Sequence, residues 1–124
     1  MTPNQFRRIA LGMYGAVEGS HMAHPDFRAN GRIFATLYPD NKRGMVNLTP
    51  EDQERFMRED PAAFEPASGA WGRQGCTTVI LASADESLVG EAMTLAWQNS
   101  GAKPSPRQRK AKRTTKRIPR LLKR

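Results

Sequence analysis

Two histidines are the first residues whose type and spacing suggest chemistry, because His21 and His24 lie three positions apart. Imidazoles this close in sequence can ligate a metal or move a proton. Along a strand, a separation of three places side chains on opposite faces, so the pair converges only if the chain turns between them. A helical zinc motif requires a separation of four, with a glutamate beside the first histidine. We therefore predict no metal site, and we expect both histidines to orient the turn at Pro25 or to line a surface groove.

Cys76 is the single cysteine of the chain, so it can form neither an internal disulfide nor a cysteine-based zinc site. Paired with His21 or His24 it would be a nucleophile with a base. A cysteine that opens a β-branched strand is more often packed and inert, and Ser68 and Ser83 lie in no nucleophile elbow. We therefore predict no catalytic residue, no cofactor and no enzymatic activity, and a reducing cytoplasm as the compartment.

A glycine-rich segment, residues 68–75, contains Trp71 and Arg73. It lacks the lysine and hydroxyl of a phosphate-binding P-loop. One interpretation is a tight loop whose Trp71 caps the core. The other is that Trp71 and Arg73 offer an aromatic face and a phosphate donor to a ligand, in a groove that they share with His21 and His24.

The strongest signal is the distribution of charge along the 124 residues. Residues 103–124 hold 11 of the 20 Lys and Arg and none of the 12 Asp and Glu, which leaves a net charge of −3 for residues 1–102. We predict a globular domain over residues 1–102 and a basic tail over residues 103–124 that is disordered by itself. The candidate phosphate contacts of the tail are Arg107, Arg109, Lys110, Lys112, Arg113, Lys116 and Arg117.

Such a tail attracts polyanions by releasing their counterions, so nucleic acid, expected to be DNA, is the predicted partner. The tail has no Phe, Tyr or Trp to stack on bases, and binding should therefore be largely independent of sequence. Because the domain itself is slightly acidic, any contribution from it must come from a local patch. Basic residues beside the predicted hairpin turns, together with the glycine-rich segment, are secondary candidates: Arg28, Arg32, Lys42, Arg43 and Arg73.

The elements that must position these residues begin with a helix at Thr2-Pro3, where a hydroxyl cap precedes a proline at the first helical position. Residues 17–48 read as a run of strands. Asn30-Gly31 is a strong hairpin signal, which joins residues 26–29 to residues 32–38.

The second strand of that hairpin should be central in the sheet, because both of its faces carry apolar groups. Strict alternation places Ile33, Ala35 and Leu37 on one face and Phe34, Thr36 and Tyr38 on the other. After a turn at residues 39–41, residues 44–48 form a further short strand and complete an antiparallel meander.

The rest of the domain adds a second helix from Thr49-Pro50, a strand over residues 76–82 and a third helix capped by Ser83 or Asp85 and ending near Asn99. The expected inward residues of that last helix are Leu88, Ala92, Leu95 and Ala96, with Trp97 beside them. The predicted fold class is α+β, with two layers: an antiparallel meander and helices packed on one face. The apolar run at residues 79–82 is far too short to span a bilayer, and residues 1–5 do not resemble a secretory signal, so no membrane association is expected.

Three segments together resemble the MmcQ/YjbR family: F-R-R-I-A-L at 6–11, S-H-M-A-H-P-D-F-R-A-N-G-R-I-F-A-T-L at 20–37 and W-G-R-Q-G-C-T-T-V at 71–79. The resemblance implies a fold like that of CyaY, the bacterial frataxin, and a DNA-binding role with a double-wing arrangement. Many relatives have a Tyr-His-Met type motif with lysines where this chain has residues 71–75, so contacts of that loop are not carried over. An iron-donor role is not expected, because Arg7 and Arg8 stand where a ridge of carboxylates would be needed.

Two functional hypotheses follow from this sequence. The first is a non-enzymatic DNA-binding protein whose tail supplies the affinity. The second is a module that binds a small molecule or a protein in the groove near His21, His24, Trp71 and Arg73. DNA versus RNA, any target sequence and the oligomeric state stay open.

Overall fold

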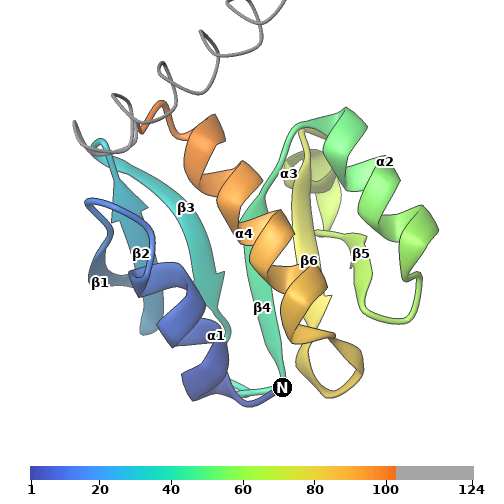
Figure 1. Ribbon diagram of the computed structural model, residues 1–124, viewed down its shortest axis with the longest axis horizontal. Coiled ribbons are helices and arrows are strands. Elements are labelled where there is room, and N and C mark those ends of the chain that lie inside the picture. Colours follow the sequence, from blue (N-terminus) through green and yellow to red (C-terminus); the bar gives the residue numbers. More distant parts are fainter. Residues whose placement is uncertain (103–124) are drawn as a thin grey trace, which may run out of the picture.

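The computed structural model describes residues 1–102, which form a six-stranded antiparallel sheet with helices packed against it (Figure 1). The strand order across the sheet is β1-β2-β3-β4-β6-β5. The strands are β1 (Val17–His21), β2 (His24–Ala29), β3 (Arg32–Leu37), β4 (Arg43–Asn47), β5 (Phe64–Pro66) and β6 (Cys76–Ile80). The predicted α+β class and meander are confirmed. The predicted tail, residues 103–124, lies outside the described part of the chain.

Side-chain caps fix where the long helices begin. In α1 (Pro3–Leu11), the Thr2 hydroxyl accepts a hydrogen bond from the Gln5 amide, and the Gln5 side chain accepts one from the Thr2 amide. The helix α2 (Pro50–Glu59) is capped by Thr49, and α4 (Glu86–Asn99) is capped by Asp85. These starts agree with the caps expected from the sequence, and Asp85 rather than Ser83 caps the last helix.

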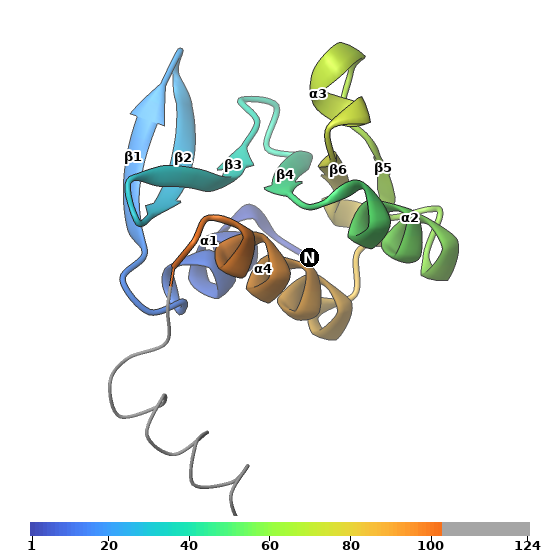
Figure 2. The same ribbon diagram turned by 90° about the horizontal axis from the view of Figure 1, so that it is seen from above.

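The core lies between the sheet and the layer formed by α1 and α4, which cover one face of it (Figure 2). Phe6 from α1, Phe27 and Phe34 from the sheet, and Met93 from α4 are completely buried there. The predicted helix layer is therefore confirmed. A short helix, α3 (Gly69–Arg73), lies on the other side of the sheet, where the sequence predicted only a glycine-rich loop.

The predicted alternation along β3 is wrong at its first two positions because the hairpin of β2 and β3 contains a β-bulge. The register shifts between Phe27 and Arg28, so that Phe27 pairs with Ala35 but Arg28 pairs with Ile33. A bulge gives one strand an extra residue and reverses the faces beyond it. As a result Phe34 is buried in the core, while Ile33 is only partly buried and lies on the opposite face.

Three further predictions need correction. The buried residues of α4 are Val89, Ala92, Met93, Ala96 and Trp97, whereas Leu88 and Leu95 are only partly buried. The helix is thus turned about its axis relative to the predicted orientation, and the Trp97 indole donates a hydrogen bond to the Tyr14 carbonyl oxygen at 2.9 Å. The last strand ends at Ile80 rather than at residue 82, because a single turn of 3₁₀ helix, η1 (Leu81–Ser83), follows it. The segment after α2 contains β5, a strand that the sequence suggested only as an ordered connection.

Within residues 1–102 the structure contains no helix with the length and apolar character needed to cross a membrane.

Candidate functional site

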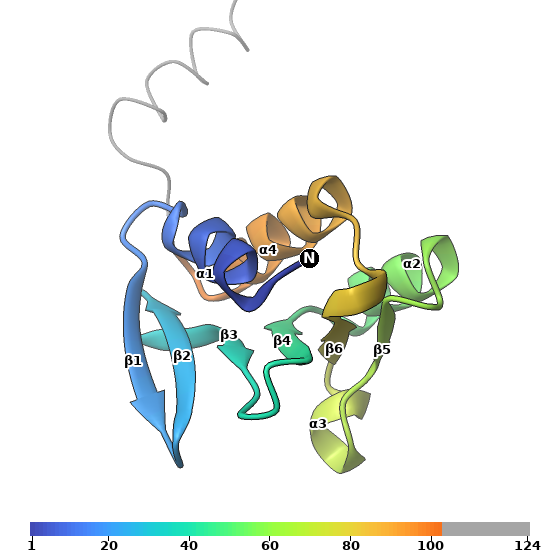
Figure 3. The same cartoon turned by 90° about the horizontal axis from the view of Figure 1, so that it is seen from below.

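A cleft of about 630 Å³ lies on the face of the sheet opposite α1 and α4. Its floor is formed by β3, β4 and β6. One wall is the tip of the β1–β2 hairpin, and the other is α3 with the segment before it. The hairpin and α3 both project on this side of the sheet (Figure 3), so the cleft lies between two projections of the fold.

The floor of the cleft follows from the alternation of side chains along β4 and β6. Gly44 and Val46 face the core, so Met45 and Asn47 face the cleft. The register of the sheet then aligns Thr36, Met45 and Thr78 in one row. The floor therefore combines a thioether with hydroxyl and amide groups, a surface that can contact an apolar body and accept or donate hydrogen bonds.

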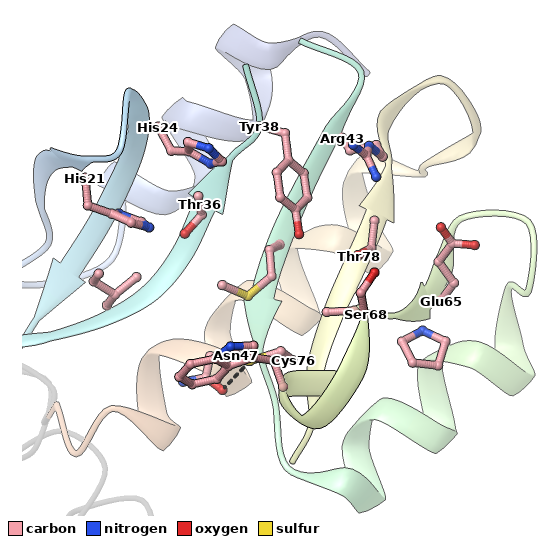
Figure 4. Close-up of a pocket in the computed structure, with 15 residues that line it drawn as sticks. His21, His24, Thr36, Tyr38, Arg43, Asn47, Glu65, Ser68, Cys76 and Thr78 are labelled. Atoms are coloured by element: carbon pink, nitrogen blue, oxygen red, sulfur yellow. Dashed lines mark hydrogen bonds between the residues drawn. The ribbon is translucent and has the colours of Figure 1, made fainter. Parts of the chain in front are cut away.

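A two-residue turn brings the two histidines together at one wall. Met22 and Ala23 have φ angles of 50° and 66°, and His21 pairs directly with His24 across the hairpin. The two rings stack with their centroids 5.6 Å apart, and both line the cleft (Figure 4). The odd spacing does not separate the two histidines, because the chain turns between them.

The wall continues from the histidines toward the turn between β3 and β4. The His24 ring meets the Tyr38 ring edge-on with the centroids 5.9 Å apart. The Arg43 guanidinium lies 4.7 Å from the centroid of Tyr38, and its Nε donates to the Asp40 carboxylate at 2.9 Å. Stacking and hydrogen bonding together hold Arg43 in place at the cleft.

Behind the histidine wall lies Asp26, whose carboxylate is completely buried. Its oxygens accept hydrogen bonds from Arg28 Nε at 2.7 Å and Nη2 at 3.0 Å, and lie 2.7 Å from His21 Nδ1. The hydrogen bonds from Arg28 lower the pKa of Asp26, and those from His21 add to this, although burial opposes both. A Cβ at Gly19 would lie 3.0 Å from the Asp26 carboxylate, so the glycine gives the ion pair its room.

The opposite wall presents Trp71, which is 69% exposed at the surface of α3. The prediction that Trp71 caps the core is therefore wrong, and it lines the cleft instead. Gln53 of α2 fixes this short helix, because its Nε2 donates to the carbonyl oxygens of Gly72 at 2.9 Å and Cys76 at 3.0 Å. A buried amide thus holds an exposed indole in position.

Cys76 lines the same cleft, but its thiol is not prepared for nucleophilic attack. Burial raises its pKa, so little thiolate is present at neutral pH. Its Sγ lies 3.5 Å from the Asn47 side-chain oxygen, as the dashed line in Figure 4 marks. No histidine is paired with it in the part of the chain that the structure describes. In residues 1–102, no three side chains of the His, Cys, Asp and Glu types are grouped as metal ligands.

The predicted basic candidates of the domain do not form one patch. Arg32 lies at the first residue of β3, whereas Lys42 and Arg43 lie beyond its last residue, so the length of the strand separates them. Arg28 is paired with Asp26. Arg73 is exposed at the end of α3 and does not line the cleft, which corrects its place in the predicted groove.

The phosphate contacts predicted for the tail lie outside the described residues. These are Arg107, Arg109, Lys110, Lys112, Arg113, Lys116 and Arg117.

Sequence reasoning missed several cleft residues. Alternation along the strand of residues 44–48 could have identified Met45 and Asn47 as partners on one face. Nothing local marks Asp26 as buried or Glu65 as a residue at the rim, because both positions depend on strand pairing.

Comparison with known proteins identifies relatives of the domain. A family model described as YjbR matches residues 11–99. A crystal structure of the Deinococcus radiodurans protein DR2400, with the family domain DUF419, is 17% identical, covers 87% of this chain and 86% of its own, and has a TM-score of 0.65. A Pseudomonas syringae protein is also 17% identical with a TM-score of 0.65, over 81% of this chain and 99% of its own. No curated protein matches the chain.

Proposed function

Because the chain belongs to the YjbR family, we propose that it is a DNA-binding protein without catalytic activity whose cationic C-terminal segment supplies most of the affinity. The observation that carries this proposal is the segregation of charge. Residues 103–124 contain 11 basic and no acidic residues, while residues 1–102 have a net charge of −3. Neutralisation of phosphates by this segment releases counterions, which favours binding to any duplex.

The place where the cationic segment begins supports a separate role for it. The helix α4 ends at Ser100-Gly101, where Gly101 has a φ of 84°. The side chain of Asn30 donates to the Ser100 carbonyl oxygen at 3.2 Å, so the end of α4 lies beside the β2–β3 turn that precedes Arg32. This point follows the helix layer, whereas the cleft lies on the other face of the sheet.

The test is a titration of fluorescent duplex DNA at several salt concentrations. The full chain is compared with residues 1–102 and with a full-length variant in which the seven tail candidates named above are changed to Gln. If six or more phosphates are contacted, log K should fall with log salt with a slope of roughly −5 or steeper, and both altered proteins should lose most of that slope. Equal affinity and equal slope for all three proteins would refute the proposal.

Parallel titrations address the kind of nucleic acid. Two duplexes of unrelated sequence should bind within about threefold of one another, because phosphate contacts carry no sequence information. A single-stranded RNA of the same charge is titrated as well. Tighter binding of the duplex indicates a preference for DNA, whereas equal binding indicates a general affinity for polyanions. Arg32→Gln in the full chain should reduce the slope by about one if Arg32 adds one phosphate contact.

The cleft favours a second candidate function, the binding of a small molecule. The Trp71 indole is 69% exposed and lines a concave cleft together with several polar groups, an arrangement typical of sites for small molecules. Thermal unfolding of the full chain with a metabolite panel tests this candidate, because a ligand of the folded state raises the unfolding temperature. The buried free thiol of Cys76 fits the reducing cytoplasm that we propose as the compartment for either function.

A further inference from the structure

We propose that the cleft binds a small organic anion that carries a flat ring. The ring would lie against Trp71 and the anionic group against Arg43, with His21 and His24 lining the same wall of the cleft. This inference rests on the second candidate function, the cleft as a binding site, and is independent of DNA binding by the C-terminal segment.

The histidine wall holds an imidazole in a fixed position at the cleft. The Asp26 carboxylate is hydrogen-bonded to Nδ1 of His21, so the other ring nitrogen, Nε2, is available to a ligand in the cleft. Because the carboxylate of Asp26 is also bound twice by Arg28, the ring is held at a fixed angle rather than free to rotate.

Arg43 continues the same wall and adds a permanent positive charge. Its Nε is engaged by Asp40 and its plane lies over Tyr38, while within residues 1–102 its two terminal nitrogens have no hydrogen-bond partner. Those nitrogens are the pair that binds carboxylate or phosphate oxygens in a fork. Tyr38 lies between Arg43 and His24, so one aromatic side chain contacts both groups.

The opposite wall suits a flat, apolar body. Trp71 offers an exposed indole, and the floor facing it contains the partly buried Met45 and Ile33. Aromatic rings pack well on an indole or beside a thioether sulfur. The volume of about 630 Å³ lies within the range of pockets for small ligands, and Asn47 and Ser68 can bind polar groups at the ring edge.

The charge of the cleft orients the ligand. Of the described residues that line it, Glu65 is the only acid, and it lies on β5 next to the α3 wall. An anionic group placed there would be repelled. The anionic group therefore belongs at Arg43, with the ring toward Trp71.

The experiment uses isotope-labelled full chain and follows the indole N–H signals of its two tryptophans by NMR. Trp71 lines the cleft, whereas Trp97 is buried in the core on α4 and donates to the Tyr14 carbonyl oxygen, so Trp97 reports any general change of the protein. The probes are adenosine monophosphate and benzoate, their neutral counterparts adenosine and benzyl alcohol, and inorganic phosphate. We expect at least one ring anion to shift Trp71 but not Trp97, and to bind about tenfold more tightly than its neutral counterpart and than phosphate.

Two pairs of variants assign the contacts. Arg43→Gln should weaken binding of the ring anion by about tenfold, whereas Arg73→Gln, which removes the same charge outside the cleft, should leave it unchanged. Trp71→Ala should abolish most of the affinity for the ring, and binding to this variant is measured from the NMR signals of the histidines. Tyr14→Ala, which removes another exposed aromatic side chain, is the control.

The outcomes separate the inference from the function on which it rests. If neutral ring compounds bind as tightly as the anions, the cleft is a binding site but the anionic ligand is refuted. If no probe shifts Trp71, both are refuted. A flat-ring anion has two sources, a free metabolite and a terminal nucleotide of a strand. A short 5′-phosphorylated oligonucleotide distinguishes these two sources. It is titrated into the full-length variant in which the seven tail candidates are changed to Gln, and it shifts the Trp71 signal only if the ligand is a terminal nucleotide.

Discussion

Asp26 is the residue on which the histidine wall depends. Its carboxylate is buried, yet it accepts two hydrogen bonds from a guanidinium that is 41% exposed and orients an imidazole that lines the cleft. A buried carboxylate without such partners would carry a large desolvation cost. The Arg28 and His21 contacts therefore stabilise the hairpin and position a cleft group at the same time.

The first prediction concerns the removal of this charge. Asp26→Asn should lower the free energy of unfolding by about 2 kcal/mol, because a neutral amide loses charge-assisted hydrogen bonds and cannot accept from Arg28 on both atoms. Urea unfolding measures the change. Asp40→Asn removes a surface carboxylate and is the control, for which we expect a much smaller loss. Equal losses in the two variants would show that the buried network contributes little.

The second prediction is the pH dependence of stability that follows from Asp26. Its pKa is lowered from an ordinary value of 3.8, chiefly by the hydrogen bonds from Arg28. The folded state therefore binds the proton less readily than the unfolded state, so the stabilisation is complete above about pH 4 and is lost as the pH falls through the folded-state pKa.

Acid titration of the unfolding free energy checks this sign. The wild-type protein should lose stability below about pH 4 more steeply than Asp26→Asn. A smaller slope will remain in the variant, because the backbone hydrogen bond from Lys42 also lowers the pKa of Asp40. If the unfolding free energy of both proteins falls equally steeply below about pH 4, Asp26 is not the source of the pH dependence.

Among the elements, α3 is the one that decides whether the cleft has a second wall. It has five residues, and its N-cap residue, Ser68, makes no side-chain capping hydrogen bond. Its position comes from tertiary contacts. Gln53 binds the Gly72 carbonyl oxygen, and the α-carbon of Gly72 packs so close to Ala67 that a Cβ would collide with the Ala67 carbonyl oxygen.

The third prediction compares two glycine substitutions in helices. Gly72→Ala should destabilise the protein by about 2 kcal/mol and shift the Trp71 indole signal, because the collision with Ala67 displaces α3. Gly90→Ala in α4 is the matched control, since its Cβ would meet open space. It should instead stabilise the protein by about 0.5–1 kcal/mol through helix propensity. Thermal unfolding and NMR spectra measure both changes, and a silent Gly72→Ala would refute the close packing.

On the scale of the described domain, the sheet separates the cleft from the layer formed by α1 and α4 (Figure 2). The cleft occupies the face away from α1 and α4, while the described chain ends at Ala102, three residues after α4. The helices and strands of residues 1–102 bury a core of their own, which includes Phe6, Phe34 and Met93. The proposed DNA contacts and the proposed cleft ligand should therefore be independent of each other.

The fourth prediction follows from this separation. The full-length variant with the seven tail candidates changed to Gln should unfold with a free energy within about 0.5 kcal/mol of wild type at moderate salt, the usual range for surface substitutions. It should also keep its affinity for the cleft probes. Chemical unfolding and the Trp71 signal measure the two quantities. A loss of more than about 1 kcal/mol would mean that those cations are bound by the acidic groups of the domain.

The sequence by itself determined the features that depend on neighbours along the chain. Thr2-Pro3 and Thr49-Pro50 start helices because a cap hydroxyl and a fixed proline φ act within one turn. Asn30-Gly31 forms its hairpin because both residues accept a positive φ, here 55° and 73°. The segregation of charge is likewise a property of the sequence alone.

The cleft was decided by the tertiary structure, because its residues are brought together by pairing between distant strands. The turn at Met22-Ala23 has left-handed residues without Gly or Asn to signal it, and it alone places His21 beside His24. The bulge at Phe34 in β3 moved Ile33 to the cleft face, since one extra residue reverses the faces of a strand. Trp71 turned outward because Gln53, eighteen residues earlier in the chain, anchors its short helix, a contact that no local pattern encodes.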